Sequence, residues 1–261
     1  MLTLAGVLGF PVRHSRSPAM MNAAFGELGL DWRYLALPVA PRRFEDTVRA
    51  LPGSGYRGAN VTLPHKLAAH ALADELTPSA TAIGAVNTLT FRDGRIEGDN
   101  TDAQGFLDAL GEPPPERCLV LGAGGAGRAV AWALRDAGAR DVAVWNRTPG
   151  RAAQLAGELG LRHAERPEAA DLVVNATSVG LGGDATEEAV VAELGLGAVP
   201  PPSLLVDLVY GGEPTALCHW AERAGARAVD GREVLVRQGA RSLEGWTGRP
   251  APVDRMRAAL S

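Results

Sequence analysis

The 261-residue chain has few of the features that mark several classes of protein. Its two cysteines, Cys118 and Cys218, are too few for a disulfide framework, and neither belongs to a Cys-x-x-Cys pair. Cys118 falls in an apolar run, so we expect it to be a small buried side chain. The five histidines show no ligand spacing, which predicts no metal site. A formal charge of -4 and a pI near 5.8 argue against a nucleic-acid partner.

Long hydrophobic runs are also missing. No stretch approaches the ~18 apolar residues that a membrane span needs, and residues 1–7 lack the basic segment of a signal peptide. We therefore expect a cytoplasmic protein with no membrane partner. A hydrophobic fraction of 46% and a charged fraction of 21% are ordinary for a soluble enzyme. The length is comfortable for two small domains.

Lysine is almost absent. Of the 26 basic residues only Lys66 is a lysine, and the others are arginines. Arginine stays protonated at any working pH, whereas lysine can release its proton. Lys66 is therefore a candidate for proton transfer, although a compositional bias of the genome would explain the arginine excess equally well.

The first hundred residues alternate short apolar runs with helical patterns, which predicts an α/β layer with a largely parallel sheet. Ser17-Pro18 is typical of an N-cap followed by proline, and Gly29 of a helix end. The further predicted elements are strands over 34–39 and 58–63, a helix over 64–76, and a hairpin of strands 85–91 and 95–96 around Asp93-Gly94.

A second α/β series begins after Pro113-Pro114-Pro115. Its predicted elements are strand 118–121, helix 126–137, strand 141–145, helix 149–159, strands 171–175 and 204–208, and a mostly helical tail over 233–260.

A glycine-rich turn separates the first strand and helix of this second series. Residues 122–127, Gly-Ala-Gly-Gly-Ala-Gly, match G-x-G-x-x-G in the context that this dinucleotide-binding motif requires. The glycines permit a tight turn and let the backbone approach a pyrophosphate at the helix N-terminus. Glycine-rich turns also serve packing, but the strand before and the helix after favour nucleotide binding.

The end of the next strand indicates which dinucleotide binds. NAD-specific folds place an acid here for the ribose 2′-hydroxyl, whereas this chain has Asn146-Arg147-Thr148 and no carboxylate before Glu158. Arg147 would pair with a 2′-phosphate, with help from its two neighbours and from Arg151. The alternative is that Arg147 is only a solvated surface charge. The absence of an acid at this strand end favours NADP over NAD.

Four polar clusters of the first series fall at strand-to-helix junctions, where α/β folds place ligands. They are Ser15-Arg16-Ser17, residues 60–66 (Asn-Val-Thr-Leu-Pro-His-Lys), 84–88 (Gly-Ala-Val-Asn-Thr) and 98–102 (Gly-Asp-Asn-Thr-Asp). Each alone has a plain explanation: Ser17 and Asp102 as N-caps, Asn87 as a turn residue, Lys66 as a solvated charge. Four such clusters at corresponding ends of predicted strands and helices together predict a ligand-binding site.

These segments resemble the shikimate dehydrogenase family and its quinate-using relatives, and the resemblance covers nearly the whole chain in the same order. Besides the four clusters and Gly105, the matching segments are 122–127, 146–148, 175–180 (Asn-Ala-Thr-Ser-Val-Gly) and 207–210 (Asp-Leu-Val-Tyr).

The resemblance implies two α/β domains facing a cleft. One is a substrate domain of residues 1–104 completed by helices in 238–261, and the other is a Rossmann-like NADP-binding domain of residues 105–237. It implies the reversible NADP-dependent reduction of 3-dehydroshikimate to shikimate, in aromatic amino acid biosynthesis, by a monomer or homodimer.

The resemblance also implies roles for single residues. Lys66 and Asp102 would be the catalytic pair, with Lys66 as general acid/base. The implied substrate-binding residues are Ser15, Ser17, Thr62, Asn87, Asp102, Tyr210 and Gln238. The implied cofactor-binding residues are Gly122, Ala123, Gly124, Gly125, Ala126, Asn146, Arg147, Thr148, Arg151, Thr177, Ser178, Leu208 and Gly231.

Chemistry agrees with the implied pair, since reducing a ketone needs a proton donor within hydrogen-bond reach of its oxygen. A carboxylate beside Lys66 would orient the ammonium, and His65 is expected to be a neighbour of the site rather than a participant. The family typically has methionine at Val234 and phenylalanine at Leu243, and these differences bear on the shape of the nicotinamide pocket.

Three alternatives remain. A quinate dehydrogenase or dual-specificity enzyme differs by one hydroxyl and the saturation of the ring, which a single polar contact can decide. A catalytically silent NADP-binding sensor needs the glycine loop and Arg147 but not Lys66 beside Asp102. A Rossmann domain that serves only as an oligomerisation scaffold explains none of the first-domain clusters.

Overall fold

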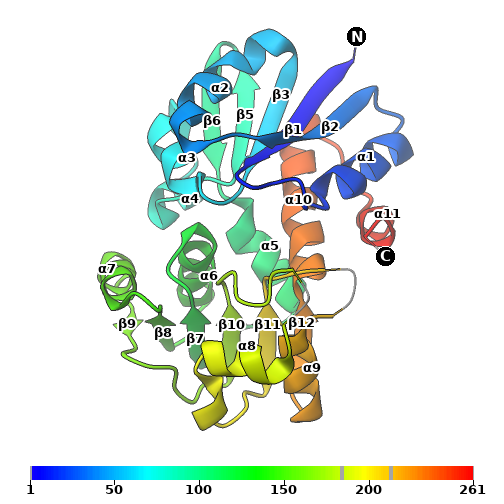
Figure 1. Cartoon of the computed structure of the whole chain (residues 1–261). Helices are drawn as coiled ribbons and strands as arrows, with labels where there is room; N and C mark the ends of the chain where they lie inside the picture. The colour runs from blue at the N-terminus through cyan, green and yellow to red at the C-terminus, as the bar shows by residue number, and fades with distance from the viewer. Residues whose placement is uncertain (1, 183–184, 212–213, 261) are drawn as a thin grey trace. The chain divides into compact units, whose positions relative to one another are not determined.

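The computed structural model describes residues 2–182, 185–211 and 214–260, and the chain divides into two compact units (Figure 1). Residues 1–105 and 235–261 form the first unit, and residues 106–234 form the second. The chain passes between them within helices α5 (Thr101–Leu110) and α10 (Gly231–Thr247). Within the described ranges, no helix is long and apolar enough to cross a bilayer.

The first unit contains a six-stranded sheet in the order β2-β1-β3-β5-β6-β4. Its strands are β1 (Thr3–Gly9), β2 (Trp32–Pro38), β3 (Tyr56–Val61), β4 (Glu75–Leu76), β5 (Thr88–Arg92) and β6 (Arg95–Asp99). Its helices besides α5 and α10 are α1 (Ser17–Glu27), η1 (Pro41–Arg43), α2 (Phe44–Ala50), η2 (Pro52–Ser54), α3 (Lys66–Leu72), α4 (Pro78–Ile83) and α11 (Val253–Ala258).

This first sheet is mixed rather than largely parallel. Strands β1, β2 and β3 are parallel, but β5 pairs antiparallel with both β3 and β6. The β5–β6 pair is the predicted hairpin, whose turn residues Asp93 and Gly94 have φ of 51° and 77°. Two successive left-handed residues form the tight turn that suits strand twist. The hairpin prediction is therefore confirmed, and the turn makes β5 antiparallel to β6.

The prediction of one helix over 64–76 is wrong. Helix α3 covers only Lys66–Leu72, and Ala73 is already extended with ψ of 136°. Asp74 then accepts a hydrogen bond from the Ile96 N–H at 2.8 Å, and β4 pairs with β6. Pairing with the edge strand β6 therefore ends the helix at Leu72, before the apolar pattern over 64–76 ends.

Two smaller expectations also need correction. Arg16, not Ser17, occupies the N-cap position of α1, and Ser17 lies within the helix. The strand expected over 85–91 begins only at Thr88, because the Val86 N–H donates to the Lys66 carbonyl at 3.0 Å instead of to the sheet.

Helices cover both faces of the first sheet. On one face α1, α10 and α11 bury a core that includes Phe25, Tyr34, Leu243 and Met256. On the other face α2, α3 and α4 pack over a second core around Phe44 and Leu89, among others. Gly58 lets α10 approach closely, because a Cβ there would lie 2.2 Å from the Trp246 indole nitrogen.

The second unit contains a wholly parallel sheet in the order β12-β11-β10-β7-β8-β9. Its strands are β7 (Arg117–Leu121), β8 (Asp141–Trp145), β9 (Arg162–His163), β10 (Leu172–Asn175), β11 (Leu204–Asp207) and β12 (Arg227–Asp230). Its helices are α6 (Gly125–Asp136), α7 (Pro149–Leu159), α8 (Glu187–Glu193), η3 (Leu196–Ala198) and α9 (Ala216–Arg223).

This strand order is that of a Rossmann fold. Counted from β7, the order across the sheet is 3-2-1-4-5-6, and the direction of winding reverses between β7 and β10. The predicted α/β fold with a Rossmann-like second part is confirmed. Ligands bind such sheets outside the carboxyl ends of the strands at this switch point, which here are Leu121 and Asn175.

Candidate active site

Lys66 and Asp102 form an ion pair in the first unit. The Lys66 Nζ donates to Asp102 Oδ2 at 2.5 Å, and the two side chains are only 13% and 17% exposed. Lys66 begins α3, and Asp102 lies in the first turn of α5. Lys66 is therefore not a solvated surface charge, and Asp102 is not an N-cap, since Asn100 Oδ1 accepts from the N–H groups of Asp102 and Ala103.

Asn87 holds the second oxygen of the same carboxylate. Its Nδ2 donates to Asp102 Oδ1 at 2.8 Å, while its Oδ1 accepts from the Thr101 N–H at 2.7 Å. Because the backbone N–H can only donate, this contact fixes which end of the amide faces Asp102. Asn87 is 2% exposed, so water cannot take over this role.

A buried polar network extends from Asn87 towards α10. Asn87 Nδ2 lies 3.3 Å from Gln238 Oε1, and Gln238 Nε2 donates to the Leu235 carbonyl at 2.7 Å. Gln238 packs against Gly105, where a Cβ would lie 2.5 Å from the Gln238 backbone nitrogen. The structure thus brings four predicted residues together: Lys66, Asp102, Asn87 and Gln238.

Sequence reasoning missed Ser242, which joins this network from α10. Asn60 Nδ2 donates to Ser242 Oγ at 2.8 Å, and the hydroxyls of Thr88 and Ser242 lie 2.9 Å apart. Tyr34 donates to the other end of the Asn60 amide at 2.7 Å. No sequence signal marked Ser242, because it lies 182 residues from Asn60 along the chain.

The remaining predicted substrate residues follow strands of both units. Ser15 Oγ accepts from the Ser17 N–H at 3.3 Å before α1, and Ser17 is buried while Ser15 is half-buried. Thr62 follows β3, and its N–H donates to the Leu8 carbonyl at 2.9 Å. Tyr210 is half-buried and belongs to the second unit, unlike the others.

Other reactive side chains have structural roles. His65 Nε2 lies 2.7 Å from the Val39 carbonyl, and its ring stacks on Phe44 with centroids 4.4 Å apart. Burial lowers the pKa of His65, so its neutral form anchors the start of α3. Burial raises the pKa of the Cys118 thiol to about 12 and that of Cys218 to about 11, so neither is a thiolate at neutral pH.

The glycine loop of the second unit has the geometry of a dinucleotide site. Gly122 has φ of 112°, and a Cβ there would lie 2.8 Å from the Ala176 carbonyl oxygen. A Cβ at Gly127 would lie 2.0 Å from the Gly122 oxygen, so this glycine lets α6 start close to the strand. No side chain caps the first turn of α6, and nothing lies within 4 Å of a Cβ at Gly124. Open N–H groups at a helix N-terminus suit an anion.

The end of β8 carries a positive charge and no acid. The Asn146 Oδ1 accepts from the Ala123 N–H at 3.3 Å, which ties this strand end to the glycine loop. Arg147 is 83% exposed, and its contact with Glu193 is long, at 3.5 Å. Thr148 and Arg151 are exposed beside it, and the first acid further on, Glu158, is paired with Arg128.

The last group of predicted cofactor residues follows β10, β11 and β12. Asn175 Oδ1 accepts from the Thr177 N–H at 3.1 Å, and Ser178 is exposed next to it. Leu208 donates its N–H to the Asn175 carbonyl at 2.9 Å. Gly231 lies where a Cβ would be 2.8 Å from the Leu208 oxygen. These residues lie at the carboxyl edge of one sheet, on the side of β7 opposite to Arg147.

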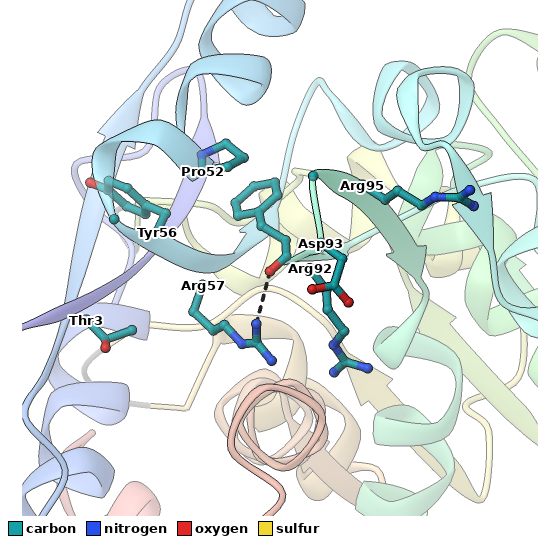
Figure 2. A pocket seen from close by; sticks show the side chains of 10 residues that line it. Thr3, Pro52, Tyr56, Arg57, Arg92, Asp93 and Arg95 are labelled. Carbon is teal, nitrogen blue, oxygen red and sulfur yellow. Dashed lines mark hydrogen bonds between the residues drawn. The ribbon is translucent and has the colours of Figure 1, made fainter.

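A separate surface pocket lies at the other end of the first sheet (Figure 2). It has a volume of about 270 Å³ and is lined by Thr3 and Tyr56, where β1 and β3 begin, and by three arginines of neighbouring strands. Arg57 donates to the Phe91 carbonyl there at 3.3 Å. No predicted site residue lines this pocket, and it lies at the amino ends of the parallel strands rather than at the carboxyl ends where α/β folds bind ligands.

Comparison with known families covers most of the chain. Residues 7–89 match the shikimate dehydrogenase substrate binding domain, residues 109–207 match the shikimate / quinate 5-dehydrogenase model, and residues 231–260 match the shikimate 5'-dehydrogenase C-terminal domain. The chain is 44% identical to the shikimate dehydrogenase (NADP(+)) of Methanopyrus kandleri, over 98% of this chain and 94% of the relative. The chain belongs to the shikimate dehydrogenase family.

Solved structures of the shikimate dehydrogenase family are close in fold. Shikimate 5-dehydrogenase from Thermus thermophilus, in complex with NADP(H) and shikimate, is 42% identical with a TM-score of 0.87, covering 99% of this chain and 98% of that one. A 5-ketofructose reductase of Gluconobacter is 30% identical with a TM-score of 0.83, covering 100% and 98%. The same fold therefore also serves an enzyme named for a different ketone.

The two departures from the shikimate dehydrogenase pattern lie in buried positions. Leu243 is fully buried in the core that α10 shares with α1 and α11. Val234 is 8% exposed. Across residues 2–182, 185–211 and 214–260, no group of three or more His, Cys, Asp or Glu side chains could hold a metal ion.

Proposed function

We propose that the chain catalyses the reversible, NADP-dependent reduction of 3-dehydroshikimate to shikimate, with Lys66 as general acid/base and Asp102 as its partner. Membership of the shikimate dehydrogenase family and the NADP-linked names of its relatives support the reaction. The observation that carries the residue assignment is the largely buried Lys66–Asp102 pair with an Nζ–Oδ2 distance of 2.5 Å.

Lys66 would transfer the proton. An ammonium has three N–H donors, and Lys66 directs one of them to Asp102. The other two have no partner among the residues that the structure describes, so one can donate to a substrate carbonyl oxygen within hydrogen-bond reach. In the oxidation direction the neutral amine would accept the hydroxyl proton.

Asp102 would orient Lys66 and also contact the substrate. Its Oδ2 accepts from Lys66 and its Oδ1 from Asn87, so the carboxylate is held at both oxygens. Each carboxylate oxygen has two lone pairs, which leaves capacity for a substrate hydroxyl. Ser15, Ser17, Thr62, Asn87, Tyr210 and Gln238 would supply the remaining contacts to the hydroxyls and carboxylate of the substrate.

The second unit would hold NADP, which supplies the hydride when bound. The residues fit this group: the glycine loop is closed to side chains at Gly122 and Gly127 and open at Gly124, where the pyrophosphate would lie. Gly125 and Ala126 would present their N–H groups to it. Arg147 would pair with the 2′-phosphate, assisted by Asn146, Thr148 and Arg151. Ala123, Thr177, Ser178, Leu208 and Gly231 would line the rest of the dinucleotide.

The test is a spectrophotometric assay of purified protein with shikimate or quinate, each with NADP or NAD. Fast reduction of NADP by shikimate, with slow turnover of quinate and of NAD, is the expected result. Comparable rates with quinate would assign a dual-specificity enzyme, because a single polar contact to the substrate can decide between the two acids. Binding of NADP without turnover of either acid would contradict the proposal and favour a silent sensor.

A further inference from the structure

A carboxylate that the proposed reaction does not use is buried at the end of β11. Asp207 is 1% exposed and accepts three hydrogen bonds: from Asn175 Nδ2 at 2.9 Å, from the Val209 N–H at 3.1 Å, and from Thr215 Oγ1 at 2.6 Å. All three donors are neutral. Aspartate is rarely buried this completely without a charged partner, so the position needs an explanation.

Burial of Asp207 opposes its ionisation. Desolvation raises the pKa of Asp207 to about 6. The three hydrogen bonds lower this pKa, and the charge of nearby Asp230 raises it further. Asp230 occupies the matching position on β12, as Asn175 does on β10. An apolar side chain at 207 would avoid the desolvation cost but would leave three polar groups without partners. The Asp207 carboxylate is therefore needed as the acceptor for three specific donors, those of Asn175, Val209 and Thr215.

One arm of this network fixes the segment that follows β10. Asn175 is fully buried, and Asp207 fixes its orientation by accepting from its Nδ2. The Asn175 Oδ1 then accepts from the Thr177 N–H at 3.1 Å and the Thr177 hydroxyl at 2.7 Å. Thr177 Oγ1 in turn accepts from the Val179 N–H at 3.0 Å. Asp207 is thus connected through Asn175 to residues 177–179, where Asn175 Nδ2 also donates to the Val179 carbonyl at 3.2 Å.

The other arm fixes the segment that follows β11. Asp207 Oδ1 accepts from the Val209 N–H, which holds the turn that carries Leu208 and Tyr210. Its Oδ2 accepts from Thr215, whose hydroxyl also caps α9 by accepting from the Cys218 N–H at 3.2 Å. A single side chain therefore joins residues 177–179, residues 208–210 and the start of α9.

We propose that Asp207 is a positioning residue, which presents the Thr177–Val179 and Leu208–Tyr210 segments to the nicotinamide half of the cofactor and to the substrate. The proposal rests on the proposed function, because that function assigns Thr177, Ser178 and Leu208 to NADP and Tyr210 to the substrate. The glycine loop and Arg147 belong to the other mononucleotide half of the fold and are outside this network.

The division into two halves gives a sharp test with Asp207→Ala and Asp207→Asn. Adenosine 2′,5′-bisphosphate would contact only the half that contains Arg147, whereas NADP would need both halves. For Asp207→Ala we expect kcat/KM with NADP and shikimate to fall by about tenfold or more. Calorimetry should show a loss of NADP affinity, with the affinity for the bisphosphate within about twofold of wild type. Asparagine can accept from Val209 and Asn175 and donate to Thr215, so Asp207→Asn should restore most of the activity.

A threonine pair provides the matched control if Asp207→Ala fails to fold. Thr215 and Thr186 both cap short helices of the second unit by accepting a backbone N–H, but only Thr215 contacts Asp207. Thr215→Val should lower kcat/KM several-fold, and Thr186→Val should leave it within about twofold of wild type.

Three results would overturn the proposal: wild-type kinetics in Asp207→Ala, a parallel loss of bisphosphate and NADP affinity, or equal effects of the two threonine variants. Failure of the proposed function is distinguishable, since wild type would then lack turnover with shikimate, while the selective loss of NADP over bisphosphate affinity in Asp207→Ala would still be measurable.

Discussion

The buried carboxylate of Asp207 should make the stability of the protein depend on pH in an unusual direction. Most carboxyl groups in folded proteins have lowered pKa values and stabilise the fold as pH rises. The pKa of Asp207 is instead raised by burial from 3.8 to about 6. The folded state then binds this proton more tightly than the unfolded state does, so the contribution of Asp207 to stability falls as pH rises between these values.

The size of the effect follows from the two pKa values. The gap between 3.8 and about 6 corresponds to ~3 kcal/mol in total, and ~2 kcal/mol of it falls between pH 4.5 and 7.5. Asp207→Asn removes this titration and keeps the shape of the side chain. The free energy of unfolding of the variant minus that of wild type should therefore increase by ~2 kcal/mol between pH 4.5 and 7.5.

Urea unfolding followed by circular dichroism at several pH values measures this difference, because the titrations of all other groups are shared by the two proteins. Asp171→Asn is the control in the same unit, since Arg117 lowers the pKa of Asp171. Its difference from wild type should stay nearly constant between pH 4.5 and 7.5, because a carboxyl group whose pKa is lowered changes stability only at and below its ordinary value of 3.8. A difference for Asp207→Asn that is constant, or that decreases as pH rises, would refute the reasoning.

Three further substitutions test other parts of the account. Arg147→Ala should raise KM for NADP roughly tenfold to a hundredfold and leave KM for NAD near wild type, because only NADP has the 2′-phosphate that Arg147 would pair with; equal changes in steady-state KM for both cofactors would contradict this role. Gly127→Ala should lower the thermal midpoint, because its Cβ would meet the Gly122 oxygen at 2.0 Å, whereas Gly124→Ala, with nothing within 4 Å, should unfold near the wild-type midpoint. Tyr34→Phe leaves the buried Asn60 Oδ1 without its donor and should cost about 1–3 kcal/mol in urea unfolding; Tyr56→Phe, at a half-buried position, should change it by less than about 0.5 kcal/mol.

Local signals predicted β7 to α7 of the second unit well, whereas β9, α8, α9 and β12 were not predicted. Strand β8 and helix α7 have the predicted bounds, because the apolar strand, the proline at Pro149 and the glycine at Gly160 all agree with the packing. The motif at residues 122–127 was identified together with its strand and helix, and its glycines are required by close backbone contacts. Where local propensity and tertiary structure agree, sequence reasoning is sufficient.

Local signals failed where distant segments decide the structure. The apolar pattern over 64–76 is compatible with a helix, but the pairing of β4 with β6 ends α3 at Leu72. The partners of Asn60 and Asp207 could not be predicted either, since Ser242 is 182 residues from Asn60, and Asn175 is 32 residues from Asp207. Such hydrogen bonds follow from the strand order and from the return of α10 to the first sheet.

The most direct test of the central claim is the turnover of Lys66→Ala with shikimate and NADP, measured beside wild type by the absorbance of reduced nicotinamide. Removing a general acid/base lowers kcat by about 10²–10⁴-fold, so the account predicts a loss in this range with NADP affinity unchanged. A kcat within about threefold of wild type would show that another group transfers the proton, and the assignment of Lys66 beside Asp102 as the reacting pair would be wrong.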